Sequence, residues 1–275
     1  MRYSLPGRVY LAGAGPGSAK LLTVRALEVL READLVLHDD LVSADVLACI
    51  PARTAVQSVG KRCGQKKITQ DEINRRMIRA ARGGKTVVRL KGGDPLIFGR
   101  THEEITALRQ AGIAFEIIPG ITAVAAAAAA AQIALTERNS ASKLVLVSNH
   151  PGTDKIPGDW YTSVTRDATV VFYMPGSDFA ALIAELAASG LGERTPCLLV
   201  SHAARPEQKM IRTSLGALEA VPEVAAPSLL IVGSAVAGAR AAEWCTPTGS
   251  AEQTGTPDSQ EFSLSLQETD KITAE

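Results

Sequence analysis

The sequence has 275 residues, of which 46% are hydrophobic and 21% are charged, so it is long enough for two compact domains with buried cores. Lysine plus arginine (29) equal aspartate plus glutamate (29), which excludes an overall field that would draw the chain to nucleic acid or to an anionic membrane. No apolar run reaches the roughly 18 to 20 residues of a membrane span, and four scattered cysteines without a secretory signal lead us to expect a cytoplasmic protein.

In the first half, short runs of β-branched residues alternate with segments of helical period. Leu21, Val24 and Leu27 recur at helical spacing, and Thr69 and Glu72 form a capping box before another helix. This alternation predicts parallel strands joined by crossover helices. The expected strands are Val9–Ala12, Leu35–His38, Ala55–Val59, Thr86–Leu90 and Phe115–Ile118.

The alternation restarts after residues 139–142. A helix that packs closely on its neighbour is expected at the alanine block 125–131, because alanine is the best helix former and is small. We predict an α/β protein of two consecutive α/β domains with mostly parallel sheets and an active-site cleft between them. The domains are expected at 1–141 and 142–245, followed by a disordered tail at 246–275 that is poor in large apolar residues. Further strands are expected at Leu144–Val147, Thr169–Tyr173, Leu198–Ser201, Lys209–Arg212 and Ser228–Val232.

A glycine-rich turn, Gly13-Ala-Gly-Pro-Gly17, follows the first expected strand. Glycines without a Cβ let backbone amides approach a ligand closely. The turn is not a dinucleotide fingerprint, because Ser18 stands where that motif has its third glycine, and the Gly-Lys-Ser/Thr of a P-loop is absent. A ligand site and a plain tight turn both remain open from this motif.

A longer loop, Arg89-Leu-Lys-Gly-Gly-Asp-Pro-Leu-Ile-Phe-Gly-Arg100, follows the fourth expected strand and precedes a helix that begins near His102. In open α/β sheets, ligands bind at the carboxyl edge of the strands, where this loop lies. Asp94 can accept a hydrogen bond from a hydroxyl or an ammonium group, and the planar fork of Arg100 suits a carboxylate. The loop therefore predicts a binding site.

Two charged residues end neighbouring strands at this same predicted edge. Asp39 follows the second expected strand, and Lys61 follows the third. An aspartate about 20 residues past a glycine-rich turn can hold a ribose hydroxyl or take a proton. A helix cap or a surface ion pair is the alternative for each residue by itself. Their joint placement favours a role in the site.

These segments together resemble the tetrapyrrole methylase family and, within it, the uroporphyrinogen-III C-methyltransferases. The resemblance spans residues 8 to 235, and the loop 89–100 is its most specific part. It rests on the segments 9–17, 38–42, 59–62, 89–100 and 135–138. By this resemblance we expect the fold of the family and a homodimer.

The resemblance implies methyl transfer from S-adenosylmethionine to carbons 2 and 7 of uroporphyrinogen III, giving precorrin-2 through precorrin-1 and releasing S-adenosylhomocysteine. It implies no metal or redox cofactor. One alternative is another tetrapyrrole methylase that acts on a cobalamin precursor. Outside this family, a nicotinamide-dependent oxidoreductase, which Ser18 disfavours, and a non-catalytic nucleotide-binding module stay open from the residues alone.

The resemblance also implies roles for single residues. Asp39 and Lys61 match positions of proton transfer, and since a free guanidinium keeps its proton, Asp39 is the expected base and Arg100 chiefly a carboxylate clamp, with a share in the proton transfer left open. The residues expected to contact S-adenosylmethionine are Pro16, Gly92, Gly93, Asp94, Ile97, Thr122, Ala123, Met174 and Ala203. Those expected to bind the tetrapyrrole are Arg100, Glu103, Arg138 and His150. Ser18, Lys66 and the pair Thr101-His102 depart from the family pattern.

Overall fold

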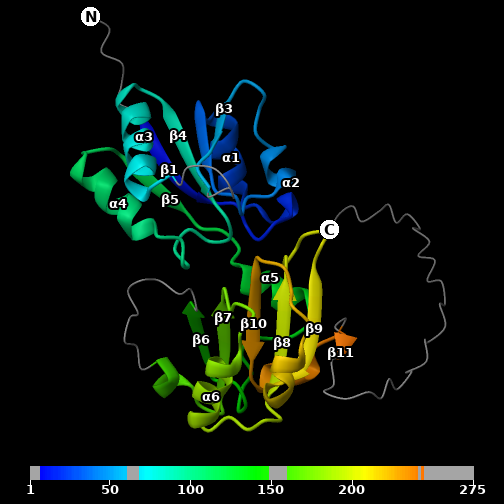
Figure 1. Ribbon diagram of the computed structural model, residues 1–275. Coiled ribbons are helices and arrows are strands. Elements are labelled where there is room, and N and C mark those ends of the chain that lie inside the picture. The colour runs from blue at the N-terminus through cyan, green and yellow to red at the C-terminus, as the bar shows by residue number, and fades with distance from the viewer. Residues whose placement is uncertain (1–6, 61–67, 149–159, 241–242, 245–275) are drawn as a thin grey trace, which may run out of the picture.

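The computed structural model describes residues 7–60, 68–148, 160–240 and 243–244, and it has two sheets, one in each half of the chain (Figure 1). The first sheet is entirely parallel, with the order β3-β2-β4-β1-β5. Its strands are β1 (Arg8–Gly13), β2 (Leu35–His38), β3 (Ala55–Ser58), β4 (Thr86–Lys91) and β5 (Phe115–Ile118). The five strands expected from the sequence are confirmed, and their carboxyl ends face the second half of the chain.

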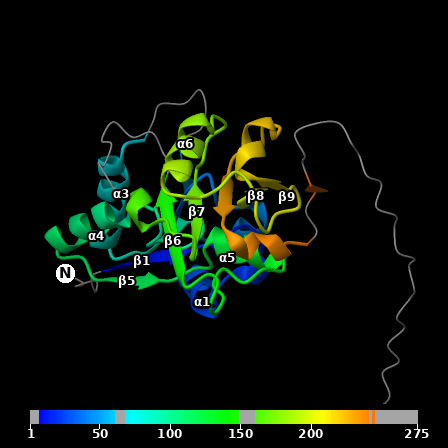
Figure 2. The ribbon, with the colours of Figure 1, turned by 90° about the horizontal axis from the view of Figure 1, so that it is seen from below.

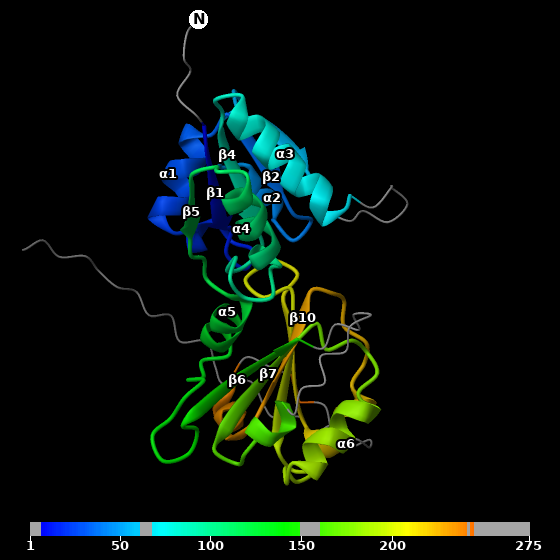
Figure 3. The same ribbon diagram turned by 90° about the vertical axis from the view of Figure 1, so that its left-hand side faces the viewer.

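Helices cover both faces of the first sheet (Figure 3). On one face, Tyr10 and Val88 pack against Leu30 of α1 (Val24–Glu32). On the other, their strand neighbours Val9 and Val87 pack against α3 (Gln70–Arg82) and α4 (Thr101–Gln110), because successive side chains of a strand point to opposite faces. The N-cap of the predicted capping box is confirmed, since the Thr69 hydroxyl accepts from the Glu72 N–H at 3.3 Å, whereas the Glu72 carboxylate binds Arg75 and Arg76. Shorter helical segments are η1 (Ala19–Leu21) and α2 (Ala44–Leu47).

The second sheet has the order β11-β9-β8-β10-β7-β6 and is mixed. The fold class is confirmed, but mostly parallel pairing holds only for the first sheet, because β10 pairs antiparallel with β7 and β8, and β8 with β9. Only residues 202–208 join β8 to β9, too few for the crossover that parallel strands require. The strands are β6 (Lys143–Ser148), β7 (Ala168–Tyr173), β8 (Pro196–Ser201), β9 (Lys209–Ser214), β10 (Ser228–Val232) and β11 (Glu243–Trp244).

Two helices lie on opposite faces of the second sheet (Figure 2). The alanine block forms α5 (Ala123–Ala130), whose buried Ala127 packs against Leu198 and Ile231. Leu186 of α6 (Ala180–Ala188) packs on the other face against Phe172. The close packing expected of the alanine helix is confirmed. The 3-10 helices η2 (Trp160–Ser163), η3 (Leu215–Ala220) and η4 (Ser234–Gly238) complete the described elements.

Within the described ranges, no helix is long and apolar enough to cross a membrane. The predicted tail at 246–275 lies outside the residues that the structure describes. The domain boundary near residue 141 stays a prediction.

Candidate functional site

The loops that follow β1, β4 and β5 meet backbone to backbone below the first sheet. The Gly93 N–H donates to the Gly15 carbonyl at 2.7 Å, and the Gly15 N–H donates back at 3.2 Å. A Cβ on Gly13 would lie 2.6 Å from the Gly120 Cα, which no side chain tolerates. Glycine is therefore required at position 13, where the backbone passes close to that of Gly120. These contacts join the three loops into one surface, which we call the loop cluster.

Asp94 holds the loop 92–100 in shape. Its Oδ1 accepts from the Leu96 N–H at 2.7 Å, and its Oδ2 accepts from the Gly120 N–H at 2.9 Å. Both carboxylate oxygens thus bind backbone amides, one in the loop itself and one in the connection between β5 and α5. Asp94 orders the loop cluster, whereas a direct contact with a cofactor stays a prediction.

Tyr173, the last residue of β7, connects the second sheet to this cluster. Its hydroxyl lies 2.6 Å from the Thr122 hydroxyl and accepts from the Val124 N–H at 3.3 Å, so it binds the start of α5. Its ring lies 5.1 Å, centroid to centroid, from that of Phe98 in the loop 92–100. Burial raises the pKa of Tyr173, which keeps the hydroxyl protonated. Tyr173, from the second sheet, therefore joins the loop 92–100 to the start of α5.

Gly93 faces the start of α5, with room between them for a Cβ, and we call this space the gap. A Cβ built on Gly93 would meet no atom closer than the Ala123 nitrogen and the Thr122 Cα, both at 4.0 Å. Met174 follows Tyr173 directly and is 43% exposed. Ile97 lies in the same loop as Gly93 and is half-buried. The structure thus places Gly93, Thr122 and Ala123 around one gap, with Ile97 and Met174 in adjoining segments.

Arg205, between β8 and β9, reaches from the second half of the chain to the first. Its guanidinium donates to the Pro16 carbonyl at 3.4 Å and to the Leu41 carbonyl. The contact is close, since a Cβ on Gly17 would lie 2.4 Å from the Arg205 Cγ. Burial lowers the pKa of Arg205. Ala203 lies buried in the same connection, which brings the predicted residues Pro16 and Ala203 to one side of the loop cluster.

Asp39 lies at the carboxyl end of β2, next to the end of β4, as the sequence predicts. Its N–H donates to the Leu90 carbonyl at 3.2 Å, and its Oδ1 accepts from the guanidinium of Arg89. Lys61, the other residue predicted to move a proton, lies outside the described residues.

Arg100 and Glu103 pair with each other at the start of α4. The Arg100 Nε lies 2.7 Å from Glu103 Oε1, and a second nitrogen lies 2.9 Å from Oε2. The two side chains are 57% and 44% exposed, so water competes for this ion pair and a substrate carboxylate can replace Glu103 at low cost. The hydrogen bonds that Arg100 donates to Glu103 raise the pKa of Arg100, which suits a clamp better than a proton acceptor.

Arg138 is not brought to the loop cluster within one chain. It lies in a tight turn closed by two hydrogen bonds between Glu137 and Ala141, just before β6 begins at Lys143. β6 runs parallel to β7, so Lys143 lies about 17 Å from the Tyr173 end, at about 3.3 Å per residue. Binding of substrate by Arg138 stays a prediction. His150 lies outside the described residues.

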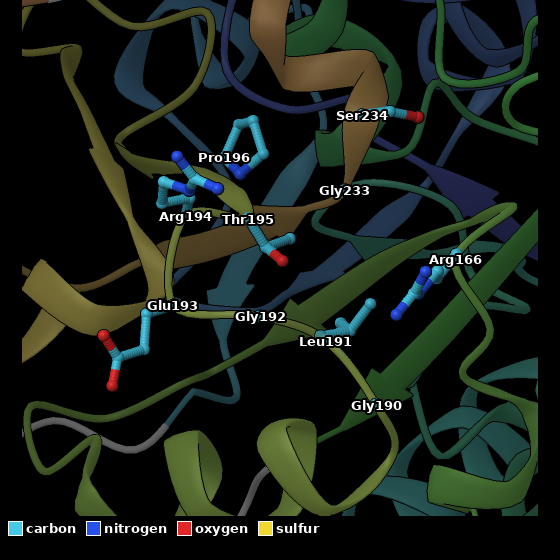
Figure 4. Close-up of a pocket in the computed structure, with 10 residues that line it drawn as sticks. All are labelled: Arg166, Gly190, Leu191, Gly192, Glu193, Arg194, Thr195, Pro196, Gly233 and Ser234. Atoms are coloured by element: carbon cyan, nitrogen blue, oxygen red, sulfur yellow. The ribbon is translucent and has the colours of Figure 1, made fainter.

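A depression of about 670 Å³ lies at this far end of the second sheet, formed largely by the loop between α6 and β8 (Figure 4). It contains none of the predicted site residues, and its arginines, Arg166 and Arg194, are exposed side chains. The loop cluster, where residues from both halves converge, is the better candidate site.

A comparison with protein families matches residues 8–219 to the Tetrapyrrole (Corrin/Porphyrin) Methylases. The chain belongs to this family. The match includes the glycine turn, the loop 92–100, Asp39 and Tyr173, and it extends into the second sheet. The resemblance to this family seen in the sequence is thereby confirmed.

Its relatives include "Siroheme synthase 1" of Klebsiella pneumoniae subsp. pneumoniae, which is 42% identical over 90% of this chain and 52% of the relative. The chain thus spans about half the length of the curated relatives it matches. Among solved structures, uroporphyrin-III C-methyl transferase from Thermus thermophilus complexed with S-adenyl homocysteine is 36% identical, with a TM-score of 0.72, over 84% of this chain and 99% of that one. Cobalt precorrin-4 methyltransferase is 30% identical, with a TM-score of 0.73, over 83% and 95%.

Sequence reasoning missed three residues that the structure places at the cluster. Tyr173 lay within the segment Phe172-Tyr-Met174 at a strand end, but periodicity does not show that its hydroxyl binds α5. Arg89 opened the recognised loop, yet its pairing with Asp39 needs the register of β2 and β4. No sequence pattern pointed to Arg205, because its hydrogen bonds join segments that are 164 and 189 residues apart.

Proposed function

We propose that this protein transfers methyl groups from S-adenosylmethionine to carbons 2 and 7 of uroporphyrinogen III, forming precorrin-2 through precorrin-1. The observation that carries the proposal is the gap between Gly93 and the start of α5, in a member of the tetrapyrrole methylases. The Thermus relative in complex with S-adenyl homocysteine supports the choice of cosubstrate.

The residues around the gap fit such a cosubstrate. The position of Gly93 leaves backbone accessible, and Met174 and Ile97 offer apolar side chains. Thr122 makes no side-chain cap, and the Val124 N–H already binds the Tyr173 hydroxyl, so the Ala123 N–H is the amide at the start of α5 that can face a polar ligand. S-adenosylmethionine, when bound, supplies an electrophilic methyl carbon, which leaves the protein chiefly the task of alignment.

The chain's own residues then have two tasks. Attack by a pyrrole carbon makes the macrocycle cationic, so a proton must leave it, and Asp39 at the strand edge is the acceptor that we propose. Arg100 exchanges Glu103 for a carboxylate of the substrate, which carries eight such groups. Lys61, Arg138 and His150 keep the roles that the resemblance implies, as part of the same proposal.

The choice between uroporphyrinogen III and a later cobalamin precursor is testable directly. The relatives named siroheme synthase and uroporphyrin-III C-methyl transferase are 42% and 36% identical, against 30% for cobalt precorrin-4 methyltransferase, which favours uroporphyrinogen III. We expect anaerobic incubation with uroporphyrinogen III and isotopically labelled S-adenosylmethionine to give a product with two labelled methyl groups by mass spectrometry. If a precorrin is labelled and uroporphyrinogen III is not, the precorrin is the substrate and our assignment is wrong.

We also propose a homodimer, on the resemblance to the family. Light scattering coupled to gel filtration should give twice the mass of the 28.9 kDa chain. A monomer that methylates at full rate would reject the dimer and leave the substrate assignment intact.

A further inference from the structure

Four ionisable side chains from three elements form a continuous network beneath the loop cluster. Arg89 Nε on β4 donates to Glu104 Oε1 on α4 at 2.9 Å, and Lys91 Nζ, also on β4, lies 3.0 Å from Glu104 Oε2. The far end of the Arg89 guanidinium donates to Asp39 Oδ1. The network therefore runs from Lys91 through Glu104 and Arg89 to Asp39.

Asp39 is the accessible end of this network. The side chains of Arg89, Lys91 and Glu104 are at most 3% exposed, whereas Asp39 is 28% exposed. The two cations and two carboxylates balance only when Asp39 is counted, because the three buried side chains alone carry two positive charges and one negative charge. Contact with solvent or a ligand is thereby concentrated at the Asp39 carboxylate.

Arg89 is held on every side. Besides Glu104 and Asp39, its guanidinium donates to the carbonyls of Leu37 at 3.4 Å and Leu90 at 3.3 Å. Burial opposes its charge, but the attraction of Asp39 and Glu104 prevails and raises the pKa of Arg89, so it stays cationic. A planar fork fixed in this way presents its outer nitrogen in one direction.

Stability alone is a weak reason for such a network. Desolvating buried ions costs about as much as their attraction returns, and apolar packing of similar volume often stabilises as well or better. An aspartate at a strand end, partly exposed, also has no need of a buried arginine. By contrast, a base that must meet one C–H bond gains from a fixed orientation, since small misplacements lower rates severely.

We propose that Arg89 is a positioning residue for Asp39: held by Glu104, it binds Oδ1 and so orients Oδ2 to accept the proton that leaves the methylated macrocycle. This inference rests on the proposed function and adds to it the means by which the base is aligned. In the step, the C–H electron pair returns to the macrocycle and neutralises its cation, while the proton passes to Asp39. Lys91 balances the charge of Glu104, so the positive charge of Arg89 is balanced by Asp39, although Arg89 also donates to Glu104.

The test is a double-mutant cycle of Arg89→Lys and Asp39→Asn, read by single-turnover methyl transfer to uroporphyrinogen III. Lysine keeps the charge but cannot reach Glu104 and Asp39 together. We expect Asp39→Asn to slow transfer about 100-fold or more and Arg89→Lys about 10-fold or more, with the tetrapyrrole KM and S-adenosylmethionine affinity changed less than about threefold. If Arg89 acts through Asp39, adding Arg89→Lys to Asp39→Asn should cause little further loss.

Arg25→Lys is the matched control. Arg25 also holds a carboxylate with a fork, at 3.1 Å from each oxygen of Glu116, but on the outer surface of α1. Its transfer rate should match that of the unchanged protein. Thermal unfolding and calorimetric titration with S-adenosylmethionine establish that each variant is folded and keeps the cosubstrate site.

Glu104→Gln provides a second route if Arg89→Lys does not fold. The amide still accepts from Arg89 but holds it less firmly than a carboxylate does. A smaller loss of rate is expected, again absent in the Asp39→Asn background.

The outcomes separate the inference from the function. If the unchanged protein does not methylate uroporphyrinogen III, the proposed function fails. If it does, but the rate of the double variant falls by the product of the two single losses, Arg89 acts independently of Asp39 and the inference is wrong. Full turnover by Asp39→Asn, or normal turnover by a folded Arg89→Lys protein, also overturns it while the function stands.

Discussion

The role that we propose for Arg100 follows from its partner in the structure, Glu103. In the structure it pairs with Glu103 through two hydrogen bonds, and both groups remain exposed. An exposed pair of this kind contributes little to stability, about 0 to 1 kcal/mol. We therefore propose that the pair keeps the Arg100 guanidinium oriented until a multiply charged ligand displaces Glu103.

We expect Arg100→Lys to raise the tetrapyrrole KM about 10-fold and to leave the dissociation constant of S-adenosylmethionine unchanged, because lysine keeps the charge but loses the bidentate geometry. Steady-state kinetics and calorimetry measure the two quantities. Arg109→Lys, on the same helix, is the control and should behave like the unchanged protein. Normal tetrapyrrole binding without methyl transfer would instead assign Arg100 to the chemical step.

The loop 92–100 acts through its backbone, so its glycines should be more sensitive than its exposed side chains. Gly93 has a φ of 67°, and Gly112, in an exposed turn after α4, has a φ of 66°. A Cβ on Gly112 would meet no atom within 4 Å, and a Cβ on Gly93 would meet only the two atoms at 4.0 Å. The two positions thus share a backbone conformation and differ in what lies beside them.

We expect Gly93→Ala and Gly112→Ala each to lower the free energy of unfolding by about 1 to 2 kcal/mol, the cost of a left-handed residue with a side chain. Only Gly93→Ala should weaken S-adenosylmethionine binding, by about 10-fold or more, because its methyl group enters the gap beside α5. Equal cosubstrate affinity in the two variants would place the site elsewhere.

The start of α5 depends on a hydroxyl from another element. Tyr173→Phe removes the bonds to Thr122 and Val124 and should lower the free energy of unfolding by about 1 to 2 kcal/mol, with weaker cosubstrate binding. Tyr10→Phe is the control, since it loses only the bond from Arg8 near the other end of the first sheet. Denaturant unfolding and calorimetry compare them. A loss of affinity in both variants would count against a specific role for Tyr173.

The order of strands along the chain could be read from the sequence, but their partners in the second half could not. Hydrophobic periodicity is local, and it located all ten expected strands. Pairing direction depends on connections, and the short link 202–208 reverses β9 against β8. The same limit applied to the site: Asp39 and Gly93 followed from motifs at strand ends, whereas Arg205 and Tyr173 act across folded distances.

Among the described residues, Arg205 makes polar contacts between the two halves of the molecule. Arg205→Met keeps the length of the side chain but removes its donors. We expect each half to stay folded and S-adenosylmethionine affinity to fall about 10-fold, because the halves must be ordered on binding. Arg194→Met, at the far end of the second sheet, should change neither quantity. Small-angle scattering should show a larger radius of gyration for the Arg205 variant, and unchanged scattering and affinity would dismiss this link.

The alanine helix also sets a dimension of the site. Because α5 contacts the second sheet through short side chains such as Ala127, its axis can lie close to the strands, and its first residues stand opposite Gly93. A larger side chain at Ala127 would push the helix away from the sheet, and Thr122, about 7.5 Å along the axis, would move with it. The width of the gap thus depends on small side chains in the core, away from the gap itself. Enlarging one of them should narrow or misalign the gap without changing any residue that lines it.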